Sequence, residues 1–501
     1  MQSAIARSPD RRVYEAARIW LVPLFVGLGV YAVCVVYARA LLNDGDTLSH
    51  IVIGRWILDH WAIPFQDPFS FAARGQTWVP HEWLAEVVFA TLYDQLGWGG
   101  VVAATGLAAA AAFALLTHAL EKSLGPRRAA IGAFAAFSLT EAHLLARPHA
   151  LAWPLLVIWM SQIVRARDAG RVPSLALLPV MILWCNLHGG FVVGLAFAGL
   201  LAVEAVAQAP ALARLQVIRG WGVFLGLAAV SALMSPNGIR LLLLPLEMLR
   251  MSFATSSISE WHSVDFAHFE PIEAWIALAI LGGFSLGLRL PPPRTAMLLL
   301  LLYEALTHVR NEELLGIIAP LLVAVALAKQ LGPAVPPAAS RAAQAGWWRT
   351  AAPAFATVIV IGLGFCTTAV ALDRYDLRPR ETVAPVAAVQ AARAAGLTGH
   401  VLNSIRFAGY LMFEGIPTFV DGRADLFGDV FLARYVAATS GIGDGLPSLL
   451  DHYGVDWTIF EPLSPSVTVL DHLPGWERTY ADRYAVVSHR KMSASEAPRR
   501  Q

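Results

Sequence analysis

The chain has 501 residues, of which 57% are hydrophobic and 15% charged, and its formal net charge is +1. Its mean hydropathy of +0.57 predicts a polytopic membrane protein and excludes an ordinary soluble one. The near-neutral charge gives no reason to propose a nucleic-acid partner. The three cysteines fall inside predicted spans, without the pairing or spacing of a disulfide framework or a zinc site.

The first predicted element is an apolar run at residues 19–42. It is too long for the apolar region of a signal peptide and lacks a convincing small-residue cleavage site, so it predicts a signal anchor. Arg7, Arg11, Arg12 and Arg18 precede it. Because basic residues flank spans on the cytoplasmic side, they predict a cytoplasmic N-terminus.

A polar stretch at residues 43–98 follows and is predicted to be the first outer loop, with helices on the membrane surface. Asp44 and Asp46 lie two residues apart, so they can share a divalent cation or hold one proton between them. A helix is predicted at residues 47–61, with Asp46 at its N-cap and His50 one turn later on the same face. Asp46 alone is explained equally well as a cap. The three residues together at a membrane surface indicate a functional site.

A second surface helix is predicted at residues 81–96, after Pro80. His81 and Glu82 lie in its first turn, where Glu82 either complements the helix dipole or contacts a substrate. This helix is expected to lie on the surface, because counting it as a span would move Lys122 and the arginines that follow to the outer side.

Apolar runs predict about eleven transmembrane helices in residues 1–372. The loops assigned to the inside hold most of the basic residues, and the odd number of spans places the C-terminal segment outside. The histidines of this region gather at the outer face, which indicates a polar cavity that opens outward. The spans after the first are predicted at residues 99–119, 127–145, 149–165, 173–187, 189–207, 217–234, 271–289, 294–308, 311–330 and 351–372.

Three residues in the middle outer loops are candidates for substrate binding. Arg147 and His149 lie in the segment HLLARPHA, and His188 interrupts an apolar run in CNLHGGF. Each histidine alone is more simply an interfacial residue with one satisfied nitrogen, and a tight turn is the alternative for CNLHGGF. The one-sided distribution of the histidines favours a function.

The later outer loops add Glu260, His262 and Arg310 as candidates. Glu260 lies beside Trp261, and an acid next to an aromatic ring can hydrogen-bond and stack on a sugar, although a solvated loop is the commoner explanation. Arg310 lies at a membrane boundary, where it either grips a phosphate through its guanidinium or anchors the helix by snorkelling.

The C-terminal part changes character. Residues 331–350 are predicted to be a Pro/Ala linker on the inside, residues 373–490 a small extracytoplasmic α/β domain, and residues 491–501 a disordered tail. The segment Asp421–Asp425 is either a ligand-binding turn or, more simply, an internal salt-bridged turn. The strands of this domain are predicted at residues 400–403, 418–421, 456–460 and 484–488.

Several short motifs resemble bacterial membrane proteins grouped with the GT-C superfamily of membrane glycosyltransferases. The motifs are DGDTLSHIVIGRWI, IPFQDPFSF, HEWLAEV, NLHGGF and VDGRADLFG. The order of a first span, an acidic pair, surface helices and an outer C-terminal domain is similar to protein O-mannosyltransferases, the lipid A aminoarabinose transferase and oligosaccharyltransferases. The motif DGD departs from the adjacent acids of the O-mannosyltransferases, which leaves the key acid open between Asp44 and Asp46.

The resemblance implies a polyprenyl-phosphate-linked sugar as donor and a hydroxyl of a glycan, lipid or protein as acceptor. It also implies that transfer takes place at the outer face of the bacterial inner membrane, with inversion. Asp44 or Asp46 would be the base, or both would bind Mg²⁺ or Mn²⁺, since some GT-C enzymes use a metal and others do not. Positive groups would stabilise the departing lipid phosphate, and the candidates are Arg55, Arg147, His188 and Arg310.

Two alternatives stay open. A lipid-glycan flippase or transporter would need polar residues through the bilayer, whereas most spans here are apolar in their middles, and the sequence has no internal repeat. A non-catalytic scaffold in envelope-glycan assembly would bind a partner enzyme through the outer domain. That alternative predicts that the acids are dispensable.

Overall fold

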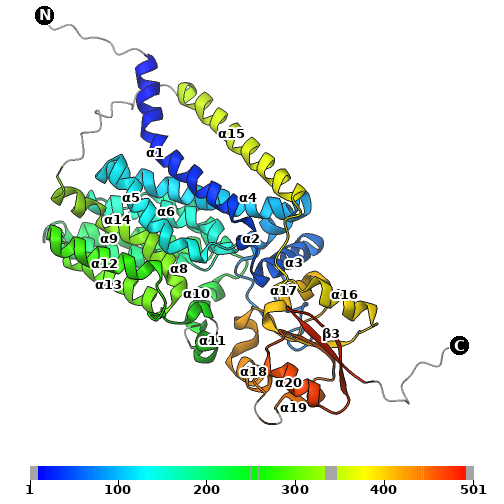
Figure 1. The fold of residues 1–501 in the computed structure, drawn as a ribbon. Coiled ribbons are helices and arrows are strands. Elements are labelled where there is room, and N and C mark those ends of the chain that lie inside the picture. Colours follow the sequence, from blue (N-terminus) through cyan, green and yellow to red (C-terminus); the bar gives the residue numbers. More distant parts are fainter. Residues whose placement is uncertain are drawn as a thin grey trace, which may run out of the picture.

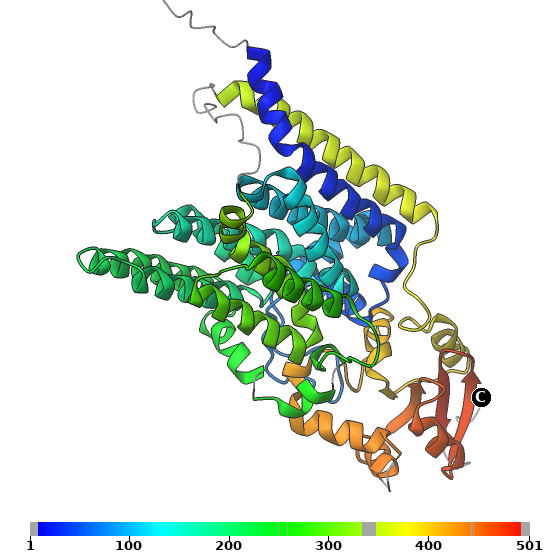
Figure 2. The same ribbon diagram turned by 60° about the vertical axis from the view of Figure 1, so that its left-hand side comes forward.

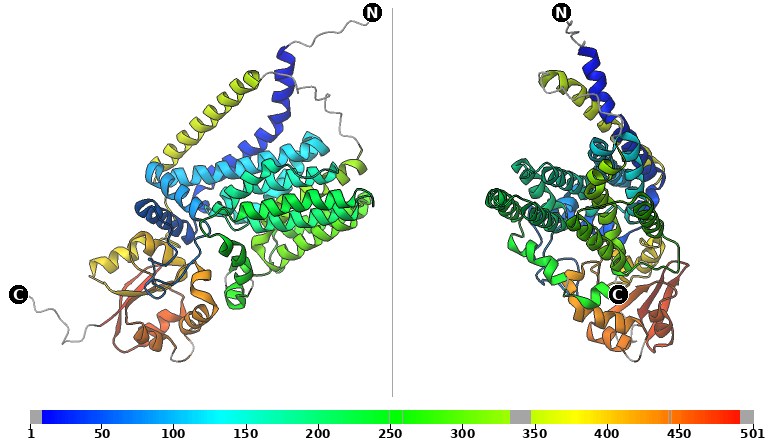
Figure 3. Two further views of the ribbon diagram at one scale, coloured as in Figure 1. Left: turned by 180° about the vertical axis from the view of Figure 1, so that it is seen from behind. Right: turned by 90° about the vertical axis from the view of Figure 1, so that its left-hand side faces the viewer.

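The computed structural model describes residues 9–248, 250–257, 259–332, 347–441, 443 and 445–491. It consists of a bundle of long helices and a smaller domain built on a four-stranded sheet at one end of the bundle (Figure 1). The views in Figures 2 and 3 show the same separation. The tail predicted to be disordered falls, from residue 492 onward, outside the described residues, as does most of the predicted linker.

Helices of the bundle overlap every predicted apolar run. The elements are α1 (Pro9–Val36), α2 (Ala38–Leu41), α3 (Gly45–His60), α4 (Trp83–Leu124), α5 (Pro126–Thr140), η1 (Glu141–His143), α6 (Pro148–Asp168), η2 (Leu175–Leu177), α7 (Leu178–Leu187), α8 (Phe191–Ala207), α9 (Arg214–Ala232), α10 (Ile239–Met248), α11 (Ser252–Ser257), η3 (Ser259–Trp261), α12 (Pro271–Leu286), α13 (Pro292–Thr307), η4 (Val309–Asn311), α14 (Glu312–Gln330) and α15 (Trp347–Arg374). Helix α15 begins inside the predicted linker, so that linker is shorter than the sequence indicated.

The apolar helices fit a membrane protein. In the described part of the chain, 3 helices are long and apolar enough to cross a membrane, at Trp83–Leu124, Arg214–Ala232 and Val309–Gln330. Shorter apolar helices lie at Trp20–Val36, Leu175–Leu187, Phe191–Ala207 and Pro271–Leu286. The predicted number of crossings stays a prediction.

A break at Gly97 divides α4 into two segments. Gly97 has φ 60° and ψ −159°, a conformation that suits glycine, and a Cβ there would collide with the Asp373 carboxylate. Two residues later, a Cβ at Gly99 would collide with the carbonyl of Ala369, so α15 packs directly on α4. The predicted surface helix and the following span are thus separate segments joined at this break.

Aromatic side chains fill the centre of the bundle. Trp153, Trp159 and Trp184 are buried, and Trp159 Nε1 donates to the carbonyl of Gly194 at 2.8 Å. A Cβ at Gly194 would collide with the Trp184 ring, so the glycine lets α8 approach its neighbours closely. Because the buried N–H of Trp159 has a hydrogen-bond partner, its burial carries no cost of an unsatisfied donor.

An ion cluster joins α6, α8 and α13 at the end of the bundle away from the sheet domain. Arg294 lies 2.7 Å from Glu204 and 2.8 Å from Asp168. Arg167 lies 3.5 Å from Glu204 and donates to the side chain of Gln208 at 2.5 Å. Arg294 and Glu204 are only 3% and 4% exposed, so each of these charges depends on the other. We call these residues the Arg294 cluster.

The C-terminal domain is a mixed sheet covered by helices. Its strands have the order β1-β2-β4-β3, in which β1 and β2 are parallel and the other pairs antiparallel. The elements are α16 (Val386–Ala394), β1 (His400–Asn403), α17 (Ile405–Phe413), α18 (Ala424–Thr439), α19 (Gly445–His452), β2 (Val455–Phe460), α20 (Pro465–His472), β3 (Trp476–Ala481) and β4 (Val486–Arg490).

The strand predicted at residues 418–421 is wrong. Thr418 forms an isolated bridge with Ser70 of the first loop, and Phe71 N donates to the Thr418 carbonyl at 2.9 Å. The side chain of Asn403 holds the segment beside β1 by accepting from Phe419 N and donating to the Val420 carbonyl. The apolar run therefore docks the domain on the first loop, because its backbone finds partners there and not in the sheet.

Glycines bring the domain directly onto α3. A Cβ at Gly409 of α17 would collide with the carbonyl of Gly45, and a Cβ at Gly45 would approach the carbonyl of Arg406 to 2.8 Å. The start of α3, which holds the acidic pair, is therefore covered by α17 (Figure 1).

Candidate functional site

Asp44, and not Asp46 as predicted, is the N-cap of α3. Asp44 has extended backbone angles, and its side chain accepts from Asp46 N at 3.3 Å. The helix begins at Gly45, two residues before the predicted start, because the carboxylate of Asp44 satisfies a free N–H of the first turn. Asp46 thereby lies inside the first turn with its side chain available for other contacts.

Arg147, at the N-cap of α6, joins the neighbouring acids Asp44 and Asp46 to Glu260, which is far from them in the sequence. Its Nε and Nη2 donate to the two oxygens of Asp44 at 2.5 and 2.7 Å. Its Nη2 also lies 3.1 Å from Asp46 Oδ2, and its Nη1 donates to Glu260 Oε1 at 2.6 Å. The loop of η3 is thus tied to the starts of α3 and α6. We call these four residues the Arg147 cluster.

The pKa values of the two aspartates of this cluster shift in opposite directions. Burial alone would raise the pKa of Asp44, but the charge and hydrogen bonds of Arg147 outweigh it and hold the pKa below its usual range. Burial raises the pKa of Asp46 to about 6 against the opposing charge of Arg147, and the negative charge of Asp44 adds to the rise. The side chain of Asp46 is 36% exposed and that of Asp44 only 8%. Asp46 is therefore the acid that can both bind and release a proton near neutral pH.

A second polar group surrounds Glu82. Its carboxylate lies 3.8 Å from His50, 3.9 Å from His81 and 3.5 Å from His188. His50 also lies 3.3 Å from Glu86, and although burial opposes its charge, this hydrogen bond and Glu82 raise the pKa of His50 to about 9. Burial opposes the charge of Glu82 as well, yet the histidines lower its pKa to about 2. The group is thus an ion network centred on one carboxylate.

His149 and Arg310 lie on the α14 side of the site. His149 Nε2 lies 3.8 Å from Glu313, and Trp153 Nε1 donates to the same carboxylate at 3.2 Å. The guanidinium carbon of Arg310 lies 4.8 Å from the centroid of the Trp261 ring. Its Nη1 forms a long ion pair of 4.0 Å with Glu260 Oε2. Among the described residues Arg310 has no other ion pair. Its guanidinium therefore keeps hydrogen-bond donors for another partner.

Two predicted site residues lie apart from these groups. Arg55 donates to Asp94 and lies over the rings of Tyr93 and Phe413. His262 is exposed, and its Nε2 lies 3.0 Å from the carbonyl of Ser256. Neither residue contacts the Arg147 cluster among the contacts of the described residues.

The turn at Asp421–Asp425 joins the site from the C-terminal domain. Arg423 pairs with Asp421 at 2.6 Å and with Asp67 at 2.8 Å, so the salt bridges extend from the turn to the first loop. A Cβ at Gly422 would collide with the Asp46 carboxylate. Burial raises the pKa of Asp425, whose charge also acts on His81. The sequence motif indicated the salt-bridged turn but not its position against Asp46.

The sequence prediction assigned no role to two further acids of the site. Glu86 is 2% exposed and holds His50, while Glu313 holds His149. The signal was present for Glu86, because it follows Glu82 by one helical turn and faces the same side of α4. Glu313 lies directly before an apolar run, in the first turn of a helix. A carboxylate there is explained by its favourable interaction with the helix dipole, so nothing in the sequence singled it out.

The predicted Asp44–Asp46 metal site does not fit a divalent cation as its side chains stand. Arg147 already contacts both oxygens of Asp44 and one of Asp46, so the guanidinium occupies the position in which a cation would neutralise the pair. In the parts of the chain that the structure describes, no group of three or more His, Cys, Asp or Glu side chains is arranged to hold a metal ion.

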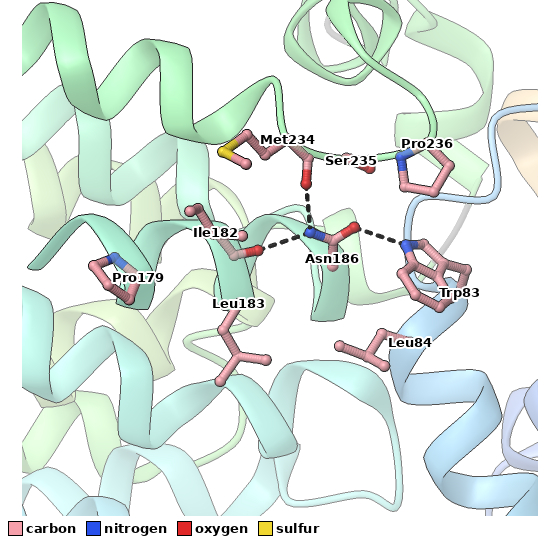
Figure 4. Close-up of a pocket in the computed structure, with 9 residues that line it drawn as sticks. All are labelled: Trp83, Leu84, Pro179, Ile182, Leu183, Asn186, Met234, Ser235 and Pro236. Atoms are coloured by element: carbon pink, nitrogen blue, oxygen red, sulfur yellow. Dashed lines mark hydrogen bonds between the residues drawn. The ribbon is translucent and has the colours of Figure 1, made fainter.

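An apolar pocket of about 580 Å³ opens beside this site, between the start of α4, α7 and the end of α9 (Figure 4). Asn186 holds its walls together by accepting from Trp83 at 2.8 Å and donating to the carbonyls of Ile182 at 2.7 Å and Met234 at 3.0 Å. Trp83 directly follows Glu82, so the pocket adjoins the histidine network.

No protein-family model matches the sequence, and no curated protein matches it either. Solved structures match its fold. ArnT from Cupriavidus metallidurans in the apo state has a TM-score of 0.50 at 15% identity, covering 94% of this chain and 98% of that chain. The archaeal oligosaccharyltransferase AglB from Archaeoglobus fulgidus, in complex with an inhibitory peptide and a dolichol-phosphate, has a TM-score of 0.50 at 10% identity, covering 86% and 69%. The resemblance to GT-C membrane proteins is thus confirmed at the level of the fold.

Proposed function

We propose that this chain is a glycosyltransferase that moves a sugar from a polyprenyl-phosphate carrier to an acceptor hydroxyl at the outer face of the membrane. The Arg147 cluster carries the proposal, because it leaves one partly exposed carboxylate, Asp46, with a pKa of about 6 beside a fixed positive charge. The fold shared with AglB supports a lipid-phosphate donor, since that structure contains a dolichol-phosphate.

Asp46 is the base in this mechanism. Asp44 is unsuited because both of its oxygens accept from Arg147. The acceptor oxygen attacks the sugar carbon bonded to the phosphate, the carbon–oxygen bond to the phosphate breaks, and the acceptor proton passes to Asp46. Arg147 orients the carboxylate, and the contact with Gly422 keeps it against the C-terminal domain.

Arg310 is the phosphate-binding residue in this mechanism. Arg147 is occupied by three carboxylates, and Arg55 is bound to Asp94. Arg310 has one long ion pair and lies on the same loop cluster as Glu260. A guanidinium with free donors stabilises the charge that develops on the leaving phosphate. The apolar pocket beside Trp83 suits the hydrocarbon chain of the carrier.

The test is transfer of labelled sugar from a panel of polyprenyl-phosphate donors by the full chain in nanodiscs. We expect Asp46→Asn to lower turnover by about a hundredfold or more, the lower end of what a positioned base contributes. The variant should still fold, because Asp44 and not Asp46 caps the helix. Asp94→Asn is the matched control, since its exposed carboxylate pairs with Arg55 outside the site. A chelator should leave the wild-type rate unchanged.

Full activity of Asp46→Asn under conditions where the wild type is active would discard this mechanism. A wild type that moves whole lipid-linked sugars between leaflets, with no transfer from any donor, would favour the flippase. A wild type without either activity whose C-terminal domain captures an envelope glycosyltransferase would favour the scaffold.

A further inference from the structure

A second cavity, of about 350 Å³, lies at the ends of α1 and α15 near the sheet domain. Val36 and Leu372 contribute apolar walls, and Tyr37 and Tyr375 are 61% and 81% exposed at its rim. Both helices pack on α4 (Figure 1), and both come from apolar runs predicted to cross the membrane. Exposed tyrosines at the end of such helices are typical of the membrane–water interface.

Two arginines line this cavity. Arg39 comes from α2 and Arg380 from the segment after α15. In the described part of the chain, neither guanidinium has an ion-pair or hydrogen-bond partner. Of the nearby acids, Asp376 pairs with Arg378 at 2.7 Å, the Asp373 carboxylate lies against Gly97, and Glu381 forms an ion pair with neither arginine in the described part of the chain. The cavity thus combines an apolar wall with two arginines that have no ion pair among the described residues.

We propose that this cavity binds the phosphate headgroup of an anionic phospholipid, with the acyl chains along α1 and α15. The arginines would neutralise the phosphate, and the apolar walls would contact the glycerol and the first methylenes. A lipid fits better than a soluble phosphate, because five of the nine lining residues are aliphatic and the cavity adjoins helices predicted to face the bilayer. The proposal is independent of glycosyl transfer, since its readout is lipid binding.

Hydrogen bonds of neighbouring residues connect this cavity to the acidic pair. Thr382 Oγ1, two residues after Arg380, donates to Asn43 Oδ1 at 2.9 Å. Ala146 N donates to the Leu41 carbonyl at 2.9 Å, directly before Arg147. A lipid that holds Arg39 and Arg380 together would therefore brace the segment that leads into Asp44.

The test is titration of the full chain in detergent with phosphatidylglycerol, read by native mass spectrometry and by the melting temperature. We expect one tightly bound lipid in the wild type and about thirtyfold weaker binding in Arg39→Gln/Arg380→Gln, from about a sixfold contribution of each arginine. The lipid should raise the melting temperature of the wild type and leave that of the double variant unchanged. Arg39→Lys/Arg380→Lys should bind more tightly than the glutamine variant, because it keeps the charge.

Arg378→Gln is the matched control, an exposed arginine of the same segment that does not line the cavity. Loss of binding in this control equal to that of the double variant would show general surface attraction and overturn the proposal. Equal binding of phosphatidylcholine, or an equal effect of inorganic phosphate, would overturn it as well. Displacement of the lipid by a lower concentration of polyprenyl phosphate would reassign the cavity to a carrier lipid and sink the phospholipid assignment.

Discussion

The Arg147 cluster and the Arg294 cluster lie at opposite ends of the bundle. They are built from the same residue types, arginine and carboxylates, but they serve different purposes. Each places one arginine between carboxylates of separate helices. Arg294 is 3% exposed and its main partner Glu204 is 4% exposed, whereas the side chain of Arg147 is 20% exposed and that of Asp46 36%. The Arg294–Glu204 pair is closed to solvent, although Asp168 at its edge is 25% exposed, whereas the Arg147 cluster is open at Asp46 and Glu260.

This difference separates a structural ion cluster from a reactive one. In the Arg294 cluster each charge is matched inside the protein, so the cluster fixes α6, α8 and α13. In the Arg147 cluster three carboxylates face one guanidinium. Burial is the larger cause of the raised pKa of Asp46, and the surplus negative charge raises it further. An acid that is costly to ionise and reachable from solvent is suited to proton transfer.

The largest expected effect falls on stability at the closed end. Arg294→Met leaves the buried Glu204 with only its longer 3.5 Å contact to Arg167, and breaking a buried pair costs about 3–5 kcal/mol. We expect a corresponding drop in the free energy of unfolding, with unchanged transfer per folded molecule. Arg289→Met, at an exposed arginine of the same end, is the control. Loss of activity without loss of stability would contradict the structural role.

The next effect falls on activity at the open end. Arg147→Gln removes the charge that orients Asp44 and Asp46, and we expect turnover to fall roughly a hundredfold, as for the loss of a preorganised charged donor. Stability should fall less than for Arg294→Met, because water reaches this cluster. Turnover and melting temperature are measured on the same preparation. A variant that unfolds like Arg294→Met yet keeps full turnover would remove the distinction between the clusters.

A smaller effect is expected at Arg310. Arg310→Gln removes one charge-assisted contact to the leaving phosphate, which corresponds to roughly a tenfold lower kcat/KM. Arg55→Gln should leave kcat/KM unchanged, since Arg55 is bound to Asp94. Steady-state kinetics with one polyprenyl-phosphate donor measures both. The reverse ranking of the two variants would place the phosphate on the α3 side.

The smallest effect is a pH dependence. Because Asp46 acts in its ionised form, turnover should rise with pH and reach half of its maximum near pH 6. Its pKa in the folded chain is above the ordinary value of 3.8, so its contribution to stability is present below about pH 4 and is lost as pH rises through about 6. Activity and stability therefore change in opposite directions over this interval. Asp46→Asn should remove the pH dependence of both turnover and stability in this interval. If the residual turnover of the variant still rises through about pH 6, the pH dependence of the rate belongs to another group.

The sequence already indicated that Arg55 lies apart from Asp46, although Arg55 is among the residues predicted to bind the phosphate. Arg55 follows Asp46 by nine residues, and nine steps of about 100° place it on the opposite side of a helix. His50 follows by four residues and shares the face of Asp46. Helical phase alone thus separates the one residue from the other, in agreement with the contact of Arg55 with Asp94.

The sequence by itself determined the helices of the bundle, the acidic pair and the change to an α/β domain, because apolar runs, caps and strand patterns act over a few residues. Only the tertiary structure decided that Arg147 joins Asp44, Asp46 and Glu260, that Thr418 pairs with the first loop, and that Gly422 adjoins Asp46. These contacts link segments separated by about a hundred residues or more, and their geometry depends on how the helices pack. Local sequence signals carry no information about such packing, which sets burial and therefore the charge state of each acid.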